Sequence, residues 1–225
     1  PKAVAGGEPD QFLVLQTAAA ALRHAGIAPG GPDHAKTAFI LGRGSYLSAG
    51  AFNLVQRTVI ADQTVRLVSQ LHPDLSADDR TELKDNLLAS LKPFEAETAP
   101  SVMPNITAGR VANRLGLMGP NYTIDAACAS SLYAVDAAVS ALLAGRSDLA
   151  LAGGVHIFNN IPFLNVFCTL GAMSKTDRIR PFDADADGML PGEGAGIIVL
   201  KRTADAQMDG DRIYAVIRGV GSSSD

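Results

Sequence analysis

Five short runs of strand-forming residues constrain the fold of this 225-residue chain most strongly, because longer segments with helical character separate them. The runs are residues 37–42 (TAFILG), 121–126 (NYTIDA), 148–155 (DLALAGGV), 195–202 (AGIIVLKR) and 212–221 (RIYAVIRGVG). Several of them are almost continuously apolar, which is typical of strands that are buried on both faces. Strands that alternate with helices predict an α/β fold around a largely buried central sheet.

The separating segments carry the composition and spacing of helices. The first is rich in helix formers and stops at Gly26, a residue that suits a helix C-terminus. We expect these helices over residues 11–25, 105–115 and 129–144. Residues 181–196 concentrate proline and glycine, so we expect a long structured loop there.

A helical excursion is predicted near residues 50–95. Apolar residues recur at helical spacing over 55–71. A second helix is expected to begin at Ser76, because Asp79 three residues later resembles a capping box, and to end at Pro93.

Composition excludes several classes of protein. The net charge is −4 and the basic residues are scattered, which gives no footprint for nucleic acid or an anionic membrane surface. No apolar run reaches the length of a membrane span, and no secretory signal opens the chain. Two cysteines fit a reducing compartment, so we expect a cytoplasmic location. Because the chain begins without Met and stops just after a strand-like run, we expect a piece of a longer protein.

Cys128 lies where the predicted strand 121–126 turns into a helix. A strand, a sharp turn and a helix together expose one side chain at the edge of a sheet, as in a nucleophile elbow. Ala126, Ala127 and Ala129 are small enough for such a turn. Free N–H groups at the helix start favour a thiolate and can donate to an oxyanion. The alternative is that Cys128 is a small buried hydrophobic residue.

The remaining cysteine and the histidines offer no obvious catalytic partner. Cys168 lies among large apolar residues, so we expect it in the core or in a pocket lining. His156 follows a predicted buried strand and could lie near the sheet edge, where a packed, hydrogen-bonded histidine is the expectation.

An aspartate-rich stretch resembles the start of a calcium loop. Its carboxylates are those of Asp183, Asp185 and Asp187. The position that needs a bidentate glutamate is Gly194, so we expect no metal site. The aspartates are expected to cap backbone N–H groups and to pair with Arg178 or Arg180.

Taken together, these stretches resemble the β-ketoacyl synthases, the ketosynthases of fatty acid and polyketide assembly. The resemblance covers roughly residues 10–225. Its motifs are GPNYTIDAACASSLYAVDAA around Cys128, LAGGV, GAMSKTDRIRPFDADADGMLPGEGAGIIVLKR and the final YAVIRGVGSSSD. The helical excursion, VFCTLGAMS and DGDRIYAVIRGVG are most similar to iterative synthases that make polyunsaturated fatty acids or enediyne cores.

The resemblance implies a thiolase-like αβαβα fold, of which residues 1–225 would be the first half and the start of the second, as one partial domain truncated at both ends. It implies that catalytic Cys128 accepts an acyl chain from an acyl carrier protein, whose phosphopantetheine arm is the only prosthetic group required. Condensation with malonyl carrier follows by loss of CO₂. It also implies a homodimer, and an acyl pocket bordered by the substrate-binding residues Phe167 and Thr107, with Thr107 reaching it across the dimer.

The sequence departs from a whole ketosynthase in one respect. The family's catalytic histidines stand in H-G-T-G-T and N-I-G-H contexts, and neither motif occurs here. We therefore expect a chain that presents the nucleophile without completing condensation alone. Three alternatives stay open: a non-catalytic partner of an active synthase, a thiolase-type acyltransferase without condensation, and a cysteine hydrolase.

Overall fold

The structure, a computed structural model, describes residues 7–30, 34–45, 48–96, 98–157 and 159–223. The chain divides into two compact units. The smaller comprises Pro1–Glu8 and Leu47–Met103, and the larger comprises Pro9–Tyr46 and Pro104–Asp225. The larger unit contains the sheet and Cys128.

The sheet of the larger unit has the strand order β2-β1-β3-β4. Its strands are β1 (Thr37–Arg43), β2 (Asn121–Ile124), β3 (Leu149–His156) and β4 (Gly194–Leu200). The first three are parallel, and β4 runs antiparallel to β3. Four of the five predicted strands are therefore confirmed. Because parallel strands end at the same edge of a sheet, the residues that follow β1, β2 and β3 meet there.

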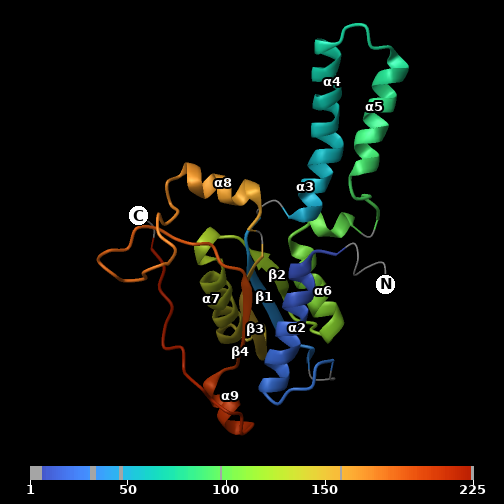
Figure 1. Cartoon of the computed structure of the whole chain (residues 1–225). Coiled ribbons are helices and arrows are strands. Elements are labelled where there is room, and N and C mark those ends of the chain that lie inside the picture. The colour runs from blue at the N-terminus through green and yellow to red at the C-terminus, as the bar shows by residue number, and fades with distance from the viewer. Residues whose placement is uncertain (1–6, 31–33, 46–47, 97, 158, 224–225) are drawn as a thin grey trace. The chain divides into compact units, whose positions relative to one another are not determined.

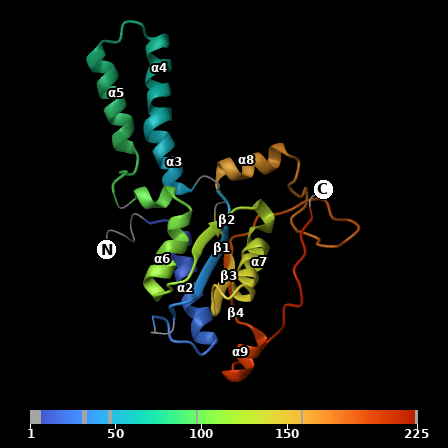
Figure 2. The ribbon, with the colours of Figure 1, turned by 180° about the vertical axis from the view of Figure 1, so that it is seen from behind.

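Helices cover both faces of this sheet (Figure 1). Helices α2 (Pro9–His24) and α6 (Asn105–Leu115) pack on one face, and α7 (Ser130–Leu143) packs on the other, as the view from behind also shows (Figure 2). Strand β1 is fully buried: Phe39 and Leu41 face α2 and α6, whereas Ala38 and Ile40 face α7. This three-layer α/β arrangement confirms the predicted fold class, with the helices predicted over 11–25, 105–115 and 129–144 in place.

The C-terminal part of the larger unit differs from the prediction at one strand. It contains α8 (Ile161–Thr169), the loop before β4 and α9 (Thr203–Met208). The strand predicted over residues 212–221 is wrong, because these residues form no regular element and are largely exposed. A strand needs a neighbouring edge for its hydrogen bonds, and no described segment pairs with this run.

The smaller unit confirms the helical excursion. Its elements are α3 (Ala49–Val55), the π-helical turn η2 (Gln56–Ile60), α4 (Ala61–Leu71), α5 (Ala77–Ser90) and the 3₁₀ turn η3 (Ala99–Val102). Helix α5 begins with the predicted capping box: Ser76 Oγ accepts from Asp79 N–H, and the Asp79 carboxylate accepts from Ser76 N–H. Among the described residues, no helix is both long and apolar enough to cross a membrane.

A buried ion pair connects α2 to the end of β1. The Nε of Arg43 donates to Oδ2 of Asp10 over 2.5 Å, and both side chains are at most 2% exposed. The hydroxyl of Thr107, on α6, donates to the same carboxylate oxygen over 3.4 Å. One carboxylate therefore joins two helices to the last residue of the central strand.

Removing one partner of this pair should destabilise the chain strongly. Arg43→Met leaves the Asp10 charge buried without its main partner, which costs about 3–5 kcal/mol of unfolding free energy. Lys36→Met is the matched control, because Lys36 pairs with Asp148 over 3.9 Å with both side chains more than half exposed. The control should lose less than ~1 kcal/mol in denaturant unfolding. Equal losses in the two variants would contradict this account.

Candidate active site

Cys128 lies in the sharp turn between β2 and α7. The turn is a 3₁₀ segment, η4 (Ala127–Ala129), and the thiol-bearing residue is exposed. Ala127, immediately before it, has φ of 48°. A left-handed alanine costs about 1–2 kcal/mol, so the surrounding structure must hold it. The strand, turn and helix form the predicted nucleophile elbow, and the alternative of Cys128 as a buried hydrophobic residue is excluded.

Two polar side chains hold this elbow. Ser130 Oγ accepts from Ala126 N–H over 2.9 Å and donates to the Ala127 carbonyl over 2.6 Å. Asp125 Oδ1 accepts from Ala127 N–H over 3.0 Å, and its Oδ2 accepts from Ser45 N–H over 2.8 Å. The N–H of Ala129 donates to the Ala126 carbonyl. Around the cysteine, the backbone of the turn is thus fixed from both ends.

The backbone N–H of Cys128 differs from its neighbours. Within the described part of the chain it donates to no backbone carbonyl or side-chain acceptor, whereas the N–H groups of Ala127 and Ala129 are both engaged. An unengaged N–H beside an exposed thiol is suited to donate to the oxygen of a bound acyl group as that oxygen becomes negative. The start of α7 adds the positive end of a helix dipole at the same place.

Glycines beneath the elbow let α7 begin directly on the sheet. Gly42 of β1 and Gly154 of β3 are paired across the two strands. A Cβ on Gly42 would lie 2.4 Å from the Ser130 carbonyl carbon, and one on Gly154 would lie 2.8 Å from Ser131 Cβ. Both are far closer than ordinary contact, so the helix start can occupy its place only because these positions lack side chains.

Asp125 is held in its charged form. The hydrogen bond from the Ser45 side chain is the main cause that lowers its pKa below the usual range, followed by the bond from Ala127 N–H. Burial acts in the opposite direction, and backbone donation from Ser45 and the positive charge of Arg43 make smaller contributions that lower the pKa. At neutral pH both carboxylate oxygens are therefore acceptors.

The two predicted substrate-binding residues, Phe167 and Thr107, lie on different helices. Phe167 is half-buried on α8, with its ring centroid 4.7 Å from that of Phe163. Thr107 is fully buried on α6, where it contacts Asp10. The roles of both residues at an acyl pocket stay predictions.

Two further predictions concern Cys168 and His156. Cys168 is exposed, so the expectation that it lies in the core is wrong, whereas a place in a pocket lining stays a prediction; α8 also exposes Ile161 and Val166, and Leu170 just after the helix is exposed as well. The apolar sequence around it indicated burial, but α8 packs on the described chain mainly through Phe163. His156 ends β3, with its Nε2 3.1 Å from Asn159 Oδ1 and its ring against Phe163. It is the packed, hydrogen-bonded histidine that was predicted.

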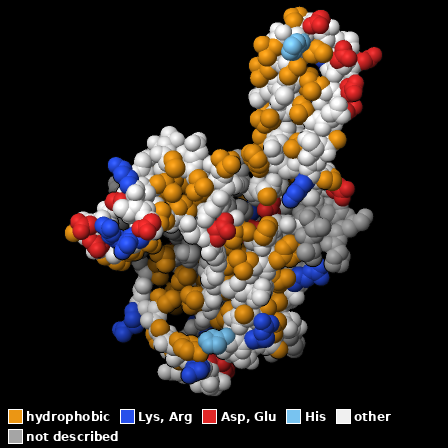
Figure 3. Space-filling model, in the orientation of Figure 1, with side chains coloured by type: hydrophobic (Ala, Val, Ile, Leu, Met, Phe, Trp, Pro, Cys, Tyr) orange, Lys and Arg blue, Asp and Glu red, His pale blue; other side chains and the backbone are white. Residues whose placement is uncertain are grey.

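Hydrogen bonds from backbone N–H groups to aspartate carboxylates stabilise the aspartate-rich loop. Asp187 accepts from Lys175 N–H and from the Ser174 hydroxyl, and Asp183 accepts from Asp185 N–H. Arg180 donates to the carbonyl of Asp185, not to a carboxylate. Capping is thus confirmed, while no ion pair from Arg178 or Arg180 to the three aspartates is found among the described residues. Figure 3 shows charged side chains of both signs gathered on this projecting loop.

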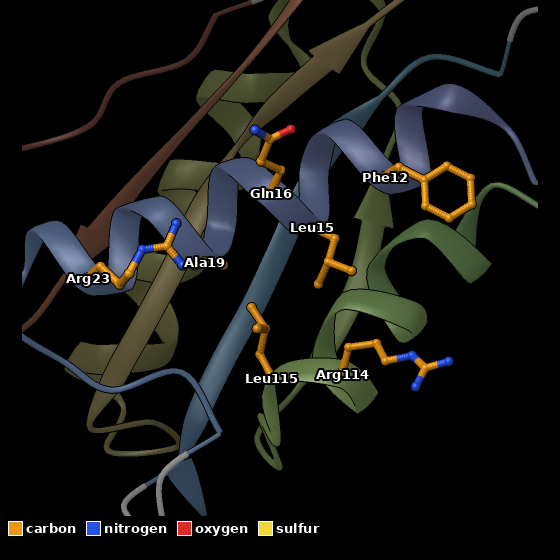
Figure 4. A pocket seen from close by; sticks show the side chains of 7 residues that line it. All are labelled: Phe12, Leu15, Gln16, Ala19, Arg23, Arg114 and Leu115. Carbon is orange, nitrogen blue, oxygen red and sulfur yellow. The ribbon is translucent and has the colours of Figure 1, made fainter. Parts of the chain in front are cut away.

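A shallow hollow of about 360 Å³ lies between α2 and α6, away from the elbow (Figure 4). Apolar side chains including Phe12, Leu15 and Leu115 line it, with Arg23 and Arg114 at its rim. It contains none of the predicted site residues. The cysteine elbow therefore remains the candidate active site.

The residues that hold the elbow were not among those predicted from the sequence. Asp125 and Ser130 stand three before and two after Cys128, and Gly42 is 86 positions away in β1. The D-A-A-C-A-S spacing was a usable signal, since aspartate and serine commonly bond to nearby backbone groups in turns. The close approach at Gly42 has no local signal, because it depends on strand register.

Comparisons with known proteins show the family of the chain. The sequence profile of the family described as "Beta-ketoacyl synthase, N-terminal domain" matches residues 1–206. A phenolphthiocerol/phthiocerol polyketide synthase from Mycobacterium tuberculosis is 35% identical over 225 residues, which is the whole of this chain and 12% of the relative. A polyunsaturated fatty acid synthase from Thraustochytrium is 35% identical over 217 residues, 96% of this chain and 8% of the relative.

Solved structures show the same fold. The ketosynthase from module 6 of the bacillaene synthase of Bacillus subtilis superposes with a TM-score of 0.66 at 27% sequence identity. The match covers 95% of this chain and 30% of that one. The thiolase-like arrangement predicted from the sequence is thereby confirmed for the N-terminal half of such a domain.

A methyl group at Gly42 should displace the elbow. Gly42→Ala places a carbon against the backbone of Ser130, and overpacking of this kind costs about 1–3 kcal/mol. We expect a lower thermal midpoint and slower alkylation of Cys128 by iodoacetamide. Gly109→Ala is the matched control, because its new methyl would meet only Asn121 Oδ1 at 3.8 Å. If Gly42→Ala were as stable and as reactive as the control, the close approach would not position the elbow.

The lowered pKa of Asp125 sets a pH window for its contribution. Since the folded-state pKa lies below the ordinary value of about 3.9, the charged form stabilises the folded chain above that value. The contribution is lost as pH falls through the folded-state pKa. The difference in thermal midpoint between wild type and Asp125→Asn should therefore be constant from about pH 5 to about pH 8 and shrink below about pH 4. A difference that grows on acidification would contradict this assignment.

Proposed function

Because the chain belongs to the β-ketoacyl synthase family, we propose that Cys128 is the nucleophile that accepts an acyl chain as a thioester. The single observation that carries this proposal is the exposed thiol of Cys128, which follows the left-handed Ala127 at the start of α7 and whose own N–H has no acceptor among the described residues. The chain spans 12% or less of the polyketide and fatty acid synthase relatives named above, so the activity of a whole synthase is part of the proposal.

In the first step, the Cys128 thiolate attacks the carbonyl carbon of an acyl thioester carried on the phosphopantetheine arm of an acyl carrier protein. The carbonyl oxygen becomes an oxyanion, which the Cys128 N–H stabilises by hydrogen bonding. The bond from carbon to the arm's sulfur then breaks, and the arm leaves as a thiolate that takes up a proton. Cys128 keeps the acyl chain, and the substrate class is therefore an acyl thioester.

In the second step, a malonyl carrier loses CO₂, and the resulting carbanion attacks the thioester carbon on Cys128. The carbon–sulfur bond to Cys128 breaks, which returns the thiolate and leaves a β-ketoacyl chain on the carrier. The family motifs that hold its catalytic histidines are absent from this sequence. We therefore propose that residues 1–225 perform the acyl transfer and depend on further residues for the condensation.

The acyl pocket and the quaternary state belong to the same proposal. Phe167 on α8 would border the acyl chain, and the exposed apolar surface of that helix supports this placement. Thr107 would border it from the second protomer of a homodimer. Among subfamilies, we place the chain with iterative synthases of the polyunsaturated-fatty-acid or enediyne type. The helical excursion supports that placement, and the similarity to the Thraustochytrium synthase supports the polyunsaturated-fatty-acid type within it.

Acyl transfer to Cys128 can be tested directly. Incubation with hexanoyl-N-acetylcysteamine should add one acyl group to the wild-type chain, visible by intact mass spectrometry and mapped to Cys128 by digestion. Cys128→Ala should lose the adduct entirely. Cys168→Ala is the control and should keep it, since Cys168 lies on α8 outside the elbow.

The outcomes separate acyl transfer to Cys128 from two of the alternatives. A stable adduct on Cys128 supports acyl transfer, whether by a synthase or by a thiolase-type acyltransferase. No adduct on wild type supports a non-catalytic partner of an active synthase, and rapid release of free hexanoic acid supports a hydrolase; either result would overturn the proposal.

A further inference from the structure

We propose that Asp125 is a positioning residue for the acyl transfer, which holds the turn at Ala127 and thereby orients the thiol and the N–H of Cys128. This inference rests on the function proposed above. Asp125 belongs to no strand or helix, because β2 ends at Ile124 and η4 begins at Ala127. Its side chain nevertheless makes the hydrogen bonds that join the elbow to the segment that follows β1.

The two carboxylate oxygens of Asp125 accept from donors that are far apart in the sequence. Oδ1 accepts from Ala127 N–H over 3.0 Å, one residue before the nucleophile. Oδ2 accepts from Ser45 N–H over 2.8 Å, 80 residues away and two positions after β1 ends. One carboxylate therefore links the turn before Cys128 to the segment that follows β1.

Only an ionised carboxylate satisfies both donors. An asparagine at this position has one acceptor oxygen, and its NH₂ group would face the second N–H, donor against donor. The hydrogen bonds from the Ser45 side chain and from Ala127 N–H chiefly favour the ionised form, and the charge of Arg43, the last residue of β1, adds a smaller contribution. Ser130 holds the opposite side of the turn through Ala126 N–H and the Ala127 carbonyl, but it makes no bond to Ala127 N–H.

The strained conformation of Ala127 explains why its N–H needs the hydrogen bond to Asp125. Ala127 has a positive φ, which alanine rarely adopts without support. If its N–H were released, the turn would relax towards ordinary geometry, and the adjoining Cys128 N–H and thiol would rotate with it. Both groups must meet one carbonyl at once, so the acyl transfer is sensitive to this rotation.

The role is not one of packing or of proton transfer. Asp125 is exposed, so an isosteric change removes hydrogen bonds without opening a cavity. Both of its oxygens are engaged by N–H groups, and a carboxylate so engaged is a weak base. It acts on the reaction through Ala127 and Cys128.

The test compares two reactions of the same sulfur. Acyl transfer from hexanoyl-N-acetylcysteamine needs the thiol and the N–H of Cys128 oriented toward the same carbonyl group. Alkylation by iodoacetamide needs only the thiol. Asp125→Asn should lower the acyl-transfer rate about ten- to a hundredfold. Its alkylation rate should change less than threefold, so the ratio of the two rates falls. Rates are followed by intact mass spectrometry on the full 225-residue chain.

The control is Asp79→Asn. Asp79 is also an exposed aspartate that accepts one backbone N–H and one hydroxyl, and its pKa is likewise lowered, chiefly by the hydrogen bond from the Ser76 side chain. It caps α5 in the smaller unit, so both rates should stay at wild-type values. Circular dichroism at the assay temperature confirms that each variant is folded.

The outcomes separate this inference from the proposed function. If wild type forms the Cys128 adduct and Asp125→Asn forms it equally fast, the positioning role is overturned while the function stands. If acyl transfer and alkylation fall by the same factor, Asp125 has only a structural role and the inference is overturned. If wild type is alkylated at Cys128 but never acylated, the proposed function fails. A selective loss of acyl transfer supports the inference.

Discussion

The close approach of α7 to the central sheet is the constraint on which the rest of the structure depends. Gly42 and Gly154 lie side by side in β1 and β3; the backbone of Ser130 and Ser131 occupies the place of a Cβ at Gly42, and the Cβ of Ser131 does so at Gly154. That contact determines how close to the sheet the first turn of α7 lies. Since Cys128 precedes α7 by one short turn, it also sets how far the thiol stands from the sheet edge. A bulkier residue at either glycine would move the nucleophile before it disturbed the core.

The layers around the sheet keep this edge in place. On one face, α2 and α6 bury large side chains against Phe39, Leu41 and Leu151, and on the other α7 packs through alanines, so it lies close to the strands. The buried Asp10–Arg43 pair fixes the last residue of β1. Arg43 in turn contributes its charge to Asp125 at the elbow. Packing thus determines where the turn lies, and polar contacts determine its conformation.

Sequence reasoning was accurate where the signal is local. The helix at Asn105–Leu115 follows from periodicity, the α5 start from Ser76 and Asp79, and the exposed turn at Cys128 from a small-residue strand end followed by a helix. Predictions were wrong where the structure of a segment depends on other segments that pair with it or pack over it. Residues 212–221 have strand composition but no described strand beside them, and Cys168 has apolar neighbours in sequence but little packed over it. The contact between Gly42 and Ser130 required the register of β1, which no single segment specifies.

The central claim is that this elbow places a thiol and its own backbone N–H around one acyl carbonyl. A crystal structure of the chain carrying a hexanoyl group on Cys128 tests it most directly. The account predicts the thioester oxygen about 2.7–3.1 Å from the Cys128 nitrogen, with Ala127 still in its left-handed conformation and bonded to Asp125. An acyl oxygen pointing away from that nitrogen, or a turn at Ala127 with ordinary negative φ, would contradict it.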